Sequence, residues 1–159
     1  EDYGLSYDPD AEILVTVGGT HAIFLALQAF INAGDEVLIP DLGFVCYEPC
    51  VHLAGGIPVS IPMRESDGFK INEETVISHI TNRTRMIIIN SPNNPTGVVL
   101  TRADLSSIAH VARERDLVVI SVEVYEKITY DDARHLCLAS FPGMRERTVV
   151  VGHFLRRML

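Results

Sequence analysis

The sequence has little lysine and no tryptophan, and it carries no excess of positive charge. Only two of its thirteen lysine and arginine residues are lysines, Lys70 and Lys127, and the formal net charge is −8. A chain this acidic, without a basic face, does not match a nucleic-acid-binding surface. No apolar run approaches the roughly 20 residues that cross a bilayer, so we expect no membrane-spanning helix. Any chemistry that needs a lysine amine must use one of two side chains.

Cysteine is also scarce, and the three residues Cys46, Cys50 and Cys137 are an odd number. Because no secretory leader precedes them, reduced thiols in a cytoplasmic protein are the interpretation that fits best. Cys46 and Cys50 have the i, i+4 spacing of a helix, but the six histidines show no ligand spacing that would complete a metal site. We therefore interpret these cysteines as packing residues and predict no bound metal.

A length of 159 residues is enough for one domain with a buried core, and no linker or low-complexity segment divides it. We therefore interpret residues 1–159 as a single domain. The chain starts at Glu1 rather than at a methionine, close to the first predicted strand. We expect it to be a truncated segment of a longer protein.

Six short apolar runs bounded by glycine, proline and polar residues predict β-strands. Pro58 lies in the third run and favours the edge of a sheet, because proline cannot donate a ladder hydrogen bond. Helices are predicted between the strands, with Thr20 and Asn72 as N-caps and a capping box at Thr101 and Asp104. Alternating strands and helices indicate an α/β protein, with three α/β/α layers around a mainly parallel sheet. The six runs span 13–17, 36–40, 57–61, 85–90, 117–122 and 148–151.

The most informative segment is 91–97, Ser-Pro-Asn-Asn-Pro-Thr-Gly, which follows the fourth predicted strand. Two prolines so close together forbid continued helix or inner strand, so the chain must turn there. In α/β sheets, ligands bind at the carboxyl ends of strands, where this turn lies. An ordinary Asn- and Pro-rich turn is the alternative.

A second turn, Gly18-Gly19-Thr20, joins the first predicted strand to a helix. Glycine lets the backbone come close to a ligand, and the free N–H groups at a helix start attract phosphate. A tight turn with a threonine cap is the plain alternative.

Together with Glu-Val-Tyr-Glu at 123–126, these segments resemble the class I/II aminotransferases, fold-type I enzymes that use pyridoxal phosphate. The resemblance runs from about residue 13 to residue 154. It implies the large, cofactor-binding domain of that family, incomplete at both ends. The family sheet has seven strands, one of them antiparallel and from beyond this chain, so we predict six strands here. The first and sixth would either pair with each other or remain exposed edges.

The resemblance also implies roles for individual residues. Gly19 and Thr20 would hold the cofactor phosphate, and Phe44 would stack on the pyridine ring, although Leu42 stands where the family usually has proline. Asn94 and Tyr125 would share the phenolic oxygen of the cofactor. The peptide bond between Asn94 and Pro95 is expected to be cis.

Two further positions depart from the family pattern. The aspartate that pairs with the pyridine nitrogen falls on Val122, and the Schiff-base lysine falls on Arg156. Valine cannot form the charged hydrogen bond, a loss of roughly 1.5–3 kcal/mol, or about ten- to a hundredfold in affinity. Glu123 is no substitute, because neighbouring side chains of a strand point to opposite faces. A guanidinium is no amine nucleophile, so we assign no catalytic residue.

Three functions remain open. The first is an aminotransferase by descent, moving an amino group from an amino acid to a 2-oxo acid, with the isolated chain inactive. The second is a non-catalytic remnant that binds pyridoxal phosphate or a partner. The third is a pyridoxal-phosphate-dependent lyase of the aminocyclopropane-carboxylate synthase type, which shares the same cofactor segments. Exposed sheet edges invite association, so we also predict a homo-oligomer.

Overall fold

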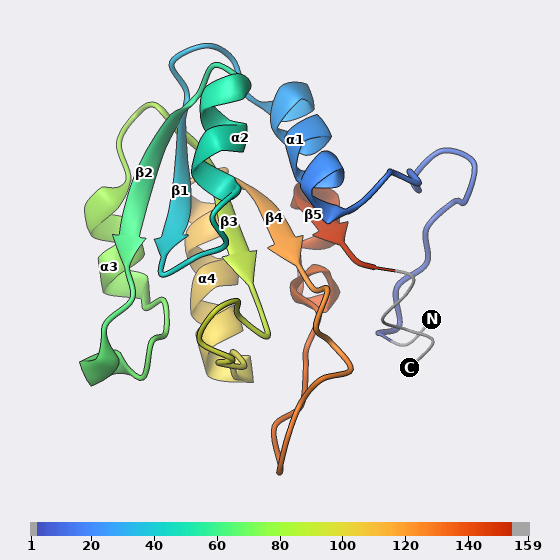
Figure 1. Ribbon diagram of the computed structural model, residues 1–159, viewed down its shortest axis with the longest axis vertical. Helices are drawn as coiled ribbons and strands as arrows, with labels where there is room; N and C mark the ends of the chain where they lie inside the picture. The colour runs from blue at the N-terminus through green and yellow to red at the C-terminus, as the bar shows by residue number, and fades with distance from the viewer. Residues whose placement is uncertain (1–2, 154–159) are drawn as a thin grey trace.

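The computed structural model describes residues 3–153 and contains one sheet of five strands (Figure 1). The strands lie in the order β2-β1-β3-β4-β5, and each neighbouring pair is parallel. β3 is central and its residues from Met86 to Asn90 are all buried, as expected for a strand covered on both faces. The strand bounds are β1 (Glu36–Asp41), β2 (Ile57–Pro62), β3 (Thr84–Asn90), β4 (Val118–Val122) and β5 (Thr148–Val151).

Helices cover both faces of this sheet, which gives the three α/β/α layers that the sequence predicts. Because successive strand residues point to opposite faces, each strand supplies two separate cores. On one face Val37, Met86 and Ile120 pack with α1 and α2, and on the other Leu38 and Ile87 pack with α3 and α4. The helices are α1 (Gly19–Phe30), α2 (Tyr47–Leu53), α3 (Glu73–His79) and α4 (Arg102–Glu114), with short 3-10 turns η1 (Glu65–Asp67), η2 (Leu138–Ser140) and η3 (Arg145–Arg147).

Five of the six predicted strands are confirmed, and β2 with Pro58 lies at a sheet edge as expected. The predicted strand at 13–17 is wrong. This segment pairs with none of the described strands, and its apolar side chains are exposed, with Val15 at 71% and Val17 at 96%. A run of β-branched residues suits a strand, but a strand also needs a neighbour for its backbone groups. The prediction of six strands is therefore too high by one among the described residues, and β5 forms an edge.

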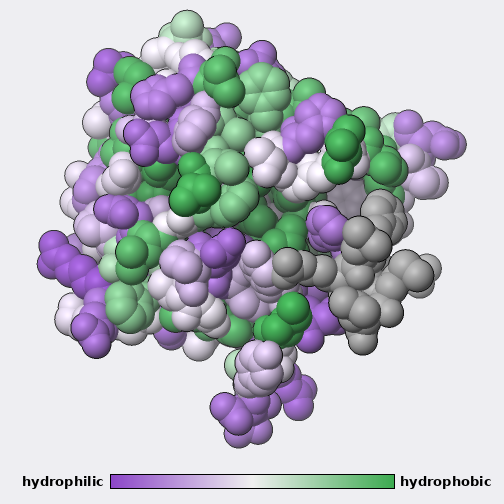
Figure 2. Space-filling model, viewed as in Figure 1, coloured by the Kyte–Doolittle hydropathy of each residue, from purple (hydrophilic) through white to green (hydrophobic). Residues whose placement is uncertain are grey.

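The exposed segment leads directly into α1, which begins at Gly19. Figure 1 shows it as the blue chain that approaches the start of α1, and Figure 2 shows apolar side chains at the surface on the same side of the molecule. Every helix within residues 3–153 is too short or too polar to cross a membrane.

Two of the three predicted helix caps are confirmed. Asn72 Oδ1 accepts the Thr75 N–H at 2.8 Å, and Thr101 with Asp104 forms a reciprocal capping box at the start of α4. Thr20 is not a cap, because α1 already begins at Gly19 with Gly18 as the N-cap. A capping residue needs a non-helical backbone, and Thr20 lies inside the first turn.

Candidate functional site

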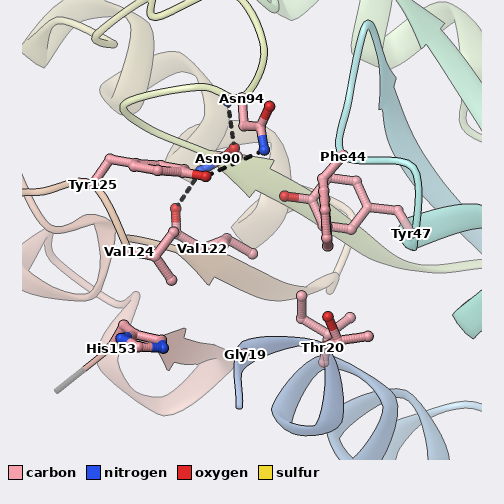
Figure 3. Close-up of a pocket in the computed structure, with 11 residues that line it drawn as sticks. Gly19, Thr20, Phe44, Tyr47, Asn90, Asn94, Val122, Val124, Tyr125 and His153 are labelled. Carbon is pink, nitrogen blue, oxygen red and sulfur yellow. Dashed lines mark hydrogen bonds between the residues drawn. The ribbon is translucent and has the colours of Figure 1, made fainter. Parts of the chain in front are cut away.

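A pocket of about 240 Å³ opens at the carboxyl ends of the strands (Figure 3). Its walls come from the start of α1, the loop after β1, and the ends of β3, β4 and β5. The pocket therefore lies where parallel α/β sheets bind ligands. All five residues predicted to bind a cofactor line it, although they come from four separate segments of the chain. The complete lining is Gly19, Thr20, Ile23, Phe44, Tyr47, Asn90, Asn94, Val122, Val124, Tyr125 and His153.

The side chains of Asn94 and Tyr125 meet in this pocket. Asn94 Nδ2 donates to Tyr125 Oη at 3.2 Å, across a separation of 31 residues in sequence (Figure 3). Both peptide bonds that precede a proline in segment 91–97 are cis, so the expected cis bond between Asn94 and Pro95 is confirmed. The amide and the hydroxyl together form a polar point that can donate to or accept from a ligand oxygen.

Asn90, the last residue of β3, fixes the turn that carries Asn94. Its Oδ1 accepts the Asn94 N–H at 2.8 Å, and its Nδ2 donates to the carbonyl oxygens of Val122 at 2.8 Å and Pro92 at 3.0 Å. The side chain is buried, and these bonds satisfy it. The turn is thereby tied to β4 as well as to its own strand.

The loop after β1 brings an aromatic wall to the pocket. Phe44 and Tyr47 pack edge to face, with ring centroids 5.8 Å apart. The loop is linked to the 91–97 turn by Asn93 Nδ2, which donates to the Leu42 carbonyl oxygen at 3.3 Å. Leu42, where the family usually has proline, adopts φ +40°, a value that the proline ring cannot reach. Phe44 lines the pocket with leucine at that position.

The amino end of α1 forms the opposite wall. No side chain caps it, and Gly19 and Thr20 of its first turn line the pocket. The free N–H groups of a helix start and the helix dipole favour an anion there. The pocket thus offers an anion site, an aromatic wall and a hydrogen-bonding pair.

Between these walls the pocket surface is apolar. Val122 and Val124 line it, while Glu123 between them points to the other side, as strand alternation predicts. Neither lysine is among the described lining residues, and Lys70 is held by Asp104 at 2.8 Å. Arg156 lies outside the described residues.

Sequence reasoning missed the polar lining residues Tyr47, Asn90 and His153, and also the apolar Ile23 and Val124. Tyr47 Oη and His153 Nδ1 are buried and have no hydrogen-bond partner among the described residues. Burial, and then the nearby Tyr125, raises the pKa of Tyr47, so its hydroxyl stays protonated. Asn90 could have been found as the polar end of an apolar strand. The positions of Tyr47 and His153 depend on how distant segments meet.

The fold and the pocket define a three-layer α/β protein with a pocket at the carboxyl edge of its parallel sheet. The chain matches the family described as aminotransferase class I and II over residues 1–152, and it belongs to that family. The enzymes of this family are aminotransferases, and their cofactor is pyridoxal phosphate.

Individual relatives agree with this assignment. The chain is 50% identical over 147 residues to an aspartate aminotransferase of Pyrococcus abyssi, an overlap of 92% of this chain and 38% of the relative. It is 43% identical over 152 residues to the putative aminotransferase YugH of Bacillus subtilis, covering 96% and 39%. The chain therefore spans about two fifths of the length of these curated relatives.

Solved structures of the family have the same fold. The aromatic aminotransferase of Pyrococcus horikoshii superposes with a TM-score of 0.94 at 51% identity, over 96% of this chain and 41% of that one. The N-succinyldiaminopimelate aminotransferase of Mycobacterium tuberculosis superposes with a TM-score of 0.90 at 44% identity, over 94% and 39%. The parallel sheet with its covering helices is thus the large-domain fold of these enzymes.

Proposed function

We propose that this chain is the cofactor-binding part of a pyridoxal-phosphate-dependent aminotransferase, and that residues 1–159 form one partial domain which binds the cofactor in the described pocket. The observation that carries the proposal is the Asn94–Tyr125 pair. Two turns distant in sequence bring an amide and a hydroxyl within 3.2 Å, in the same pocket as an uncapped helix start.

The lining residues suit the two ends of the cofactor. The backbone of Gly19 and Thr20 would hold the phosphate, because helix N-termini bind such anions. Asn94 and Tyr125 would hold the phenolic oxygen, and Phe44 would lie against the ring. When bound, pyridoxal phosphate supplies an electron-accepting ring to an amino-acid substrate.

The pocket does not suit the pyridine nitrogen or the covalent attachment. Val122 offers no charge to a protonated nitrogen, and the lysine position falls on Arg156. A guanidinium cannot act as an amine nucleophile, and its high pKa makes it a poor general base. We therefore propose that this polypeptide alone does not transfer an amino group from an amino acid to a 2-oxo acid.

Val122 favours a second candidate, a binding module without catalysis. Such a pocket would contact the phosphate and the phenolic oxygen of the cofactor but present an apolar surface to its ring. It would bind the cofactor weakly and would not catalyse a reaction with it. Cytoplasmic location and self-association remain predictions from the sequence.

A covalent-trapping experiment separates these outcomes. The chain is mixed with pyridoxal phosphate, an amino acid and a 2-oxo acid, and a complete aminotransferase of the family serves as the positive control. We expect no turnover and no stoichiometric label after borohydride reduction, as measured by mass spectrometry. Turnover, or one label per chain at Lys70 or Lys127, would contradict the proposed inactivity.

A further inference from the structure

A buried acid–histidine pair lies directly behind the pocket wall, outside the site itself. Glu123 Oε2 is 2.9 Å from His135 Nε2, and both side chains are only 3% exposed. Ser121 Oγ donates to the other carboxylate oxygen at 2.8 Å. Sequence spacing did not reveal this pair, because the two residues are twelve positions apart and join only when the chain folds.

The pair closes the base of the loop that carries Tyr125. β4 ends at Val122, and the Glu123 N–H still donates to the Val151 carbonyl oxygen at 2.8 Å, which fixes Glu123 at the sheet edge. The chain then leaves the sheet as the long orange loop of Figure 1 and returns at His135. Tyr125 stands two residues beyond Glu123 and starts a turn in which the Ile128 N–H donates to its carbonyl oxygen at 2.8 Å.

The placement of this pair is not explained by stability alone. Burying an acid and a histidine costs desolvation energy, and an apolar pair of similar volume is often as stable. His135 Nδ1 adds to the cost, because it is buried without a hydrogen-bond partner among the described residues. Burial, and then the charge of Glu123, raises the pKa of the neighbouring Cys137 thiol to about 12, so that thiol stays neutral and adds no second negative charge.

We propose that Glu123 and His135 are positioning residues that clamp the loop base and so hold the Tyr125 hydroxyl against Asn94. A polar contact has a defined direction, whereas apolar packing tolerates small shifts. Because the Asn94–Tyr125 contact is 3.2 Å long, a shift of about an ångström at the loop base would break it. This positioning role rests on the proposed function in one respect, the identity of the ligand that the Tyr125 hydroxyl contacts.

The test replaces the pair by leucines and follows Tyr125 directly. The chain, which has five tyrosines, is labelled with 3-fluorotyrosine, and the Tyr125 signal is assigned by its loss in Y125F. In the unsubstituted chain, N94A should shift this fluorine signal, because the hydroxyl loses its partner. In E123L/H135L the melting temperature should be retained, while the Tyr125 signal moves and no longer responds to N94A. D132N, an exposed acid in the same loop, is the matched control and should behave like the unsubstituted chain.

The proposal would be overturned if the Tyr125 fluorine signal of E123L/H135L stayed where it is in the unsubstituted chain and still shifted when N94A was added. If that double variant does not fold, H135Q is judged by the same signal and the same two outcomes. A second measurement uses pyridoxamine phosphate, for which E123L/H135L and Y125F should each weaken binding by about tenfold. Failure of the unsubstituted chain to bind this probe would refute the proposed function, while the fluorine signals would still decide the positioning role.

Discussion

Val122 forms part of the pocket wall at the end of β4, with its side chain beside Val124. Its carbonyl oxygen already accepts a hydrogen bond from Asn90 Nδ2. A substitution of Val122 therefore changes what a ligand meets through the side chain. An apolar side chain there leaves a protonated ring nitrogen without a counter-charge. Under the proposed function, the affinity of the pocket for a pyridinium ring would therefore depend on this one residue.

Replacing Val122 by aspartate should tighten the binding of pyridoxamine phosphate by about ten- to a hundredfold, the value of a charged hydrogen bond. The same change should lower the stability of the unliganded chain, because it buries an unpaired acid. Titration calorimetry measures the affinity. V122N, which has nearly the same shape without the charge, is the control and should gain far less. Equal affinities for V122D and the unsubstituted chain would show that the ring nitrogen lies elsewhere.

Among the secondary-structure elements, β1 and β3 are joined at their starts by Glu36. This buried acid accepts hydrogen bonds from Thr81, Arg83 and Thr84, with the Arg83 Nη2 at 2.7 Å and the Thr84 Oγ1 at 3.1 Å. The Thr81 hydrogen bond is the largest influence, and together with Arg83 it outweighs burial and lowers the pKa of Glu36. The acid thus fixes the turn before β3 in its charged form.

E36Q should lower the free energy of unfolding by about 1–3 kcal/mol at neutral pH, because charged hydrogen bonds are lost. A lowered pKa in the folded state stabilises the protein above the ordinary glutamate pKa of about 4.3, and this contribution is lost as the pH falls through the folded value. The difference between E36Q and the unsubstituted chain should therefore shrink on acidification. Urea unfolding from pH 7 to pH 3 measures it, with E65Q at an exposed glutamate as the control. A difference that stays constant with pH would contradict the role of the charge.

Sequence patterns predict elements well where the signal is local. The apolar runs of β1 to β5 and the caps at Asn72 and Thr101 depend on neighbouring residues, and all were found within a residue or two. The failure at 13–17 has the opposite cause. Its residues suit a strand, but whether a partner lies alongside is a property of the whole chain.

The same distinction holds for the pocket. Asn94, Tyr125 and the Gly19 turn were predicted from short motifs, and the structure brings them together. The burial of Tyr47 and the pairing of Glu123 with His135 were missed, because both arise only from contacts between segments far apart in sequence.

For the molecule as a whole, the two edges of the sheet differ in what they expose. β2 carries Pro58 and Pro62, which lack the N–H that a further strand would bind. β5 has no proline, and its Val150 is 38% exposed. An edge of this kind favours association with another chain.

The predicted homo-oligomer should therefore form through β5. V150K places a charge on this edge and should raise the monomer fraction at a given concentration, as measured by sedimentation velocity. Ile57 on β2 has the same 38% exposure as Val150, so I57K is the matched control and should leave association unchanged. Equal effects of both variants, or a chain that is monomeric throughout, would contradict association through β5.

The central proposal is that the pocket binds the phosphorylated cofactor, with Val122 and Arg156 at the positions of the family's aspartate and lysine. The most direct measurement is the equilibrium binding of pyridoxamine phosphate, whose amine cannot label Lys70 or Lys127. Pyridoxamine without phosphate is the comparison ligand, and N94A and Y125F are the site variants. The account predicts saturable binding of one equivalent that needs the phosphate and weakens by about tenfold in each variant. Equal binding of both ligands, or binding that N94A and Y125F leave unchanged, would contradict it.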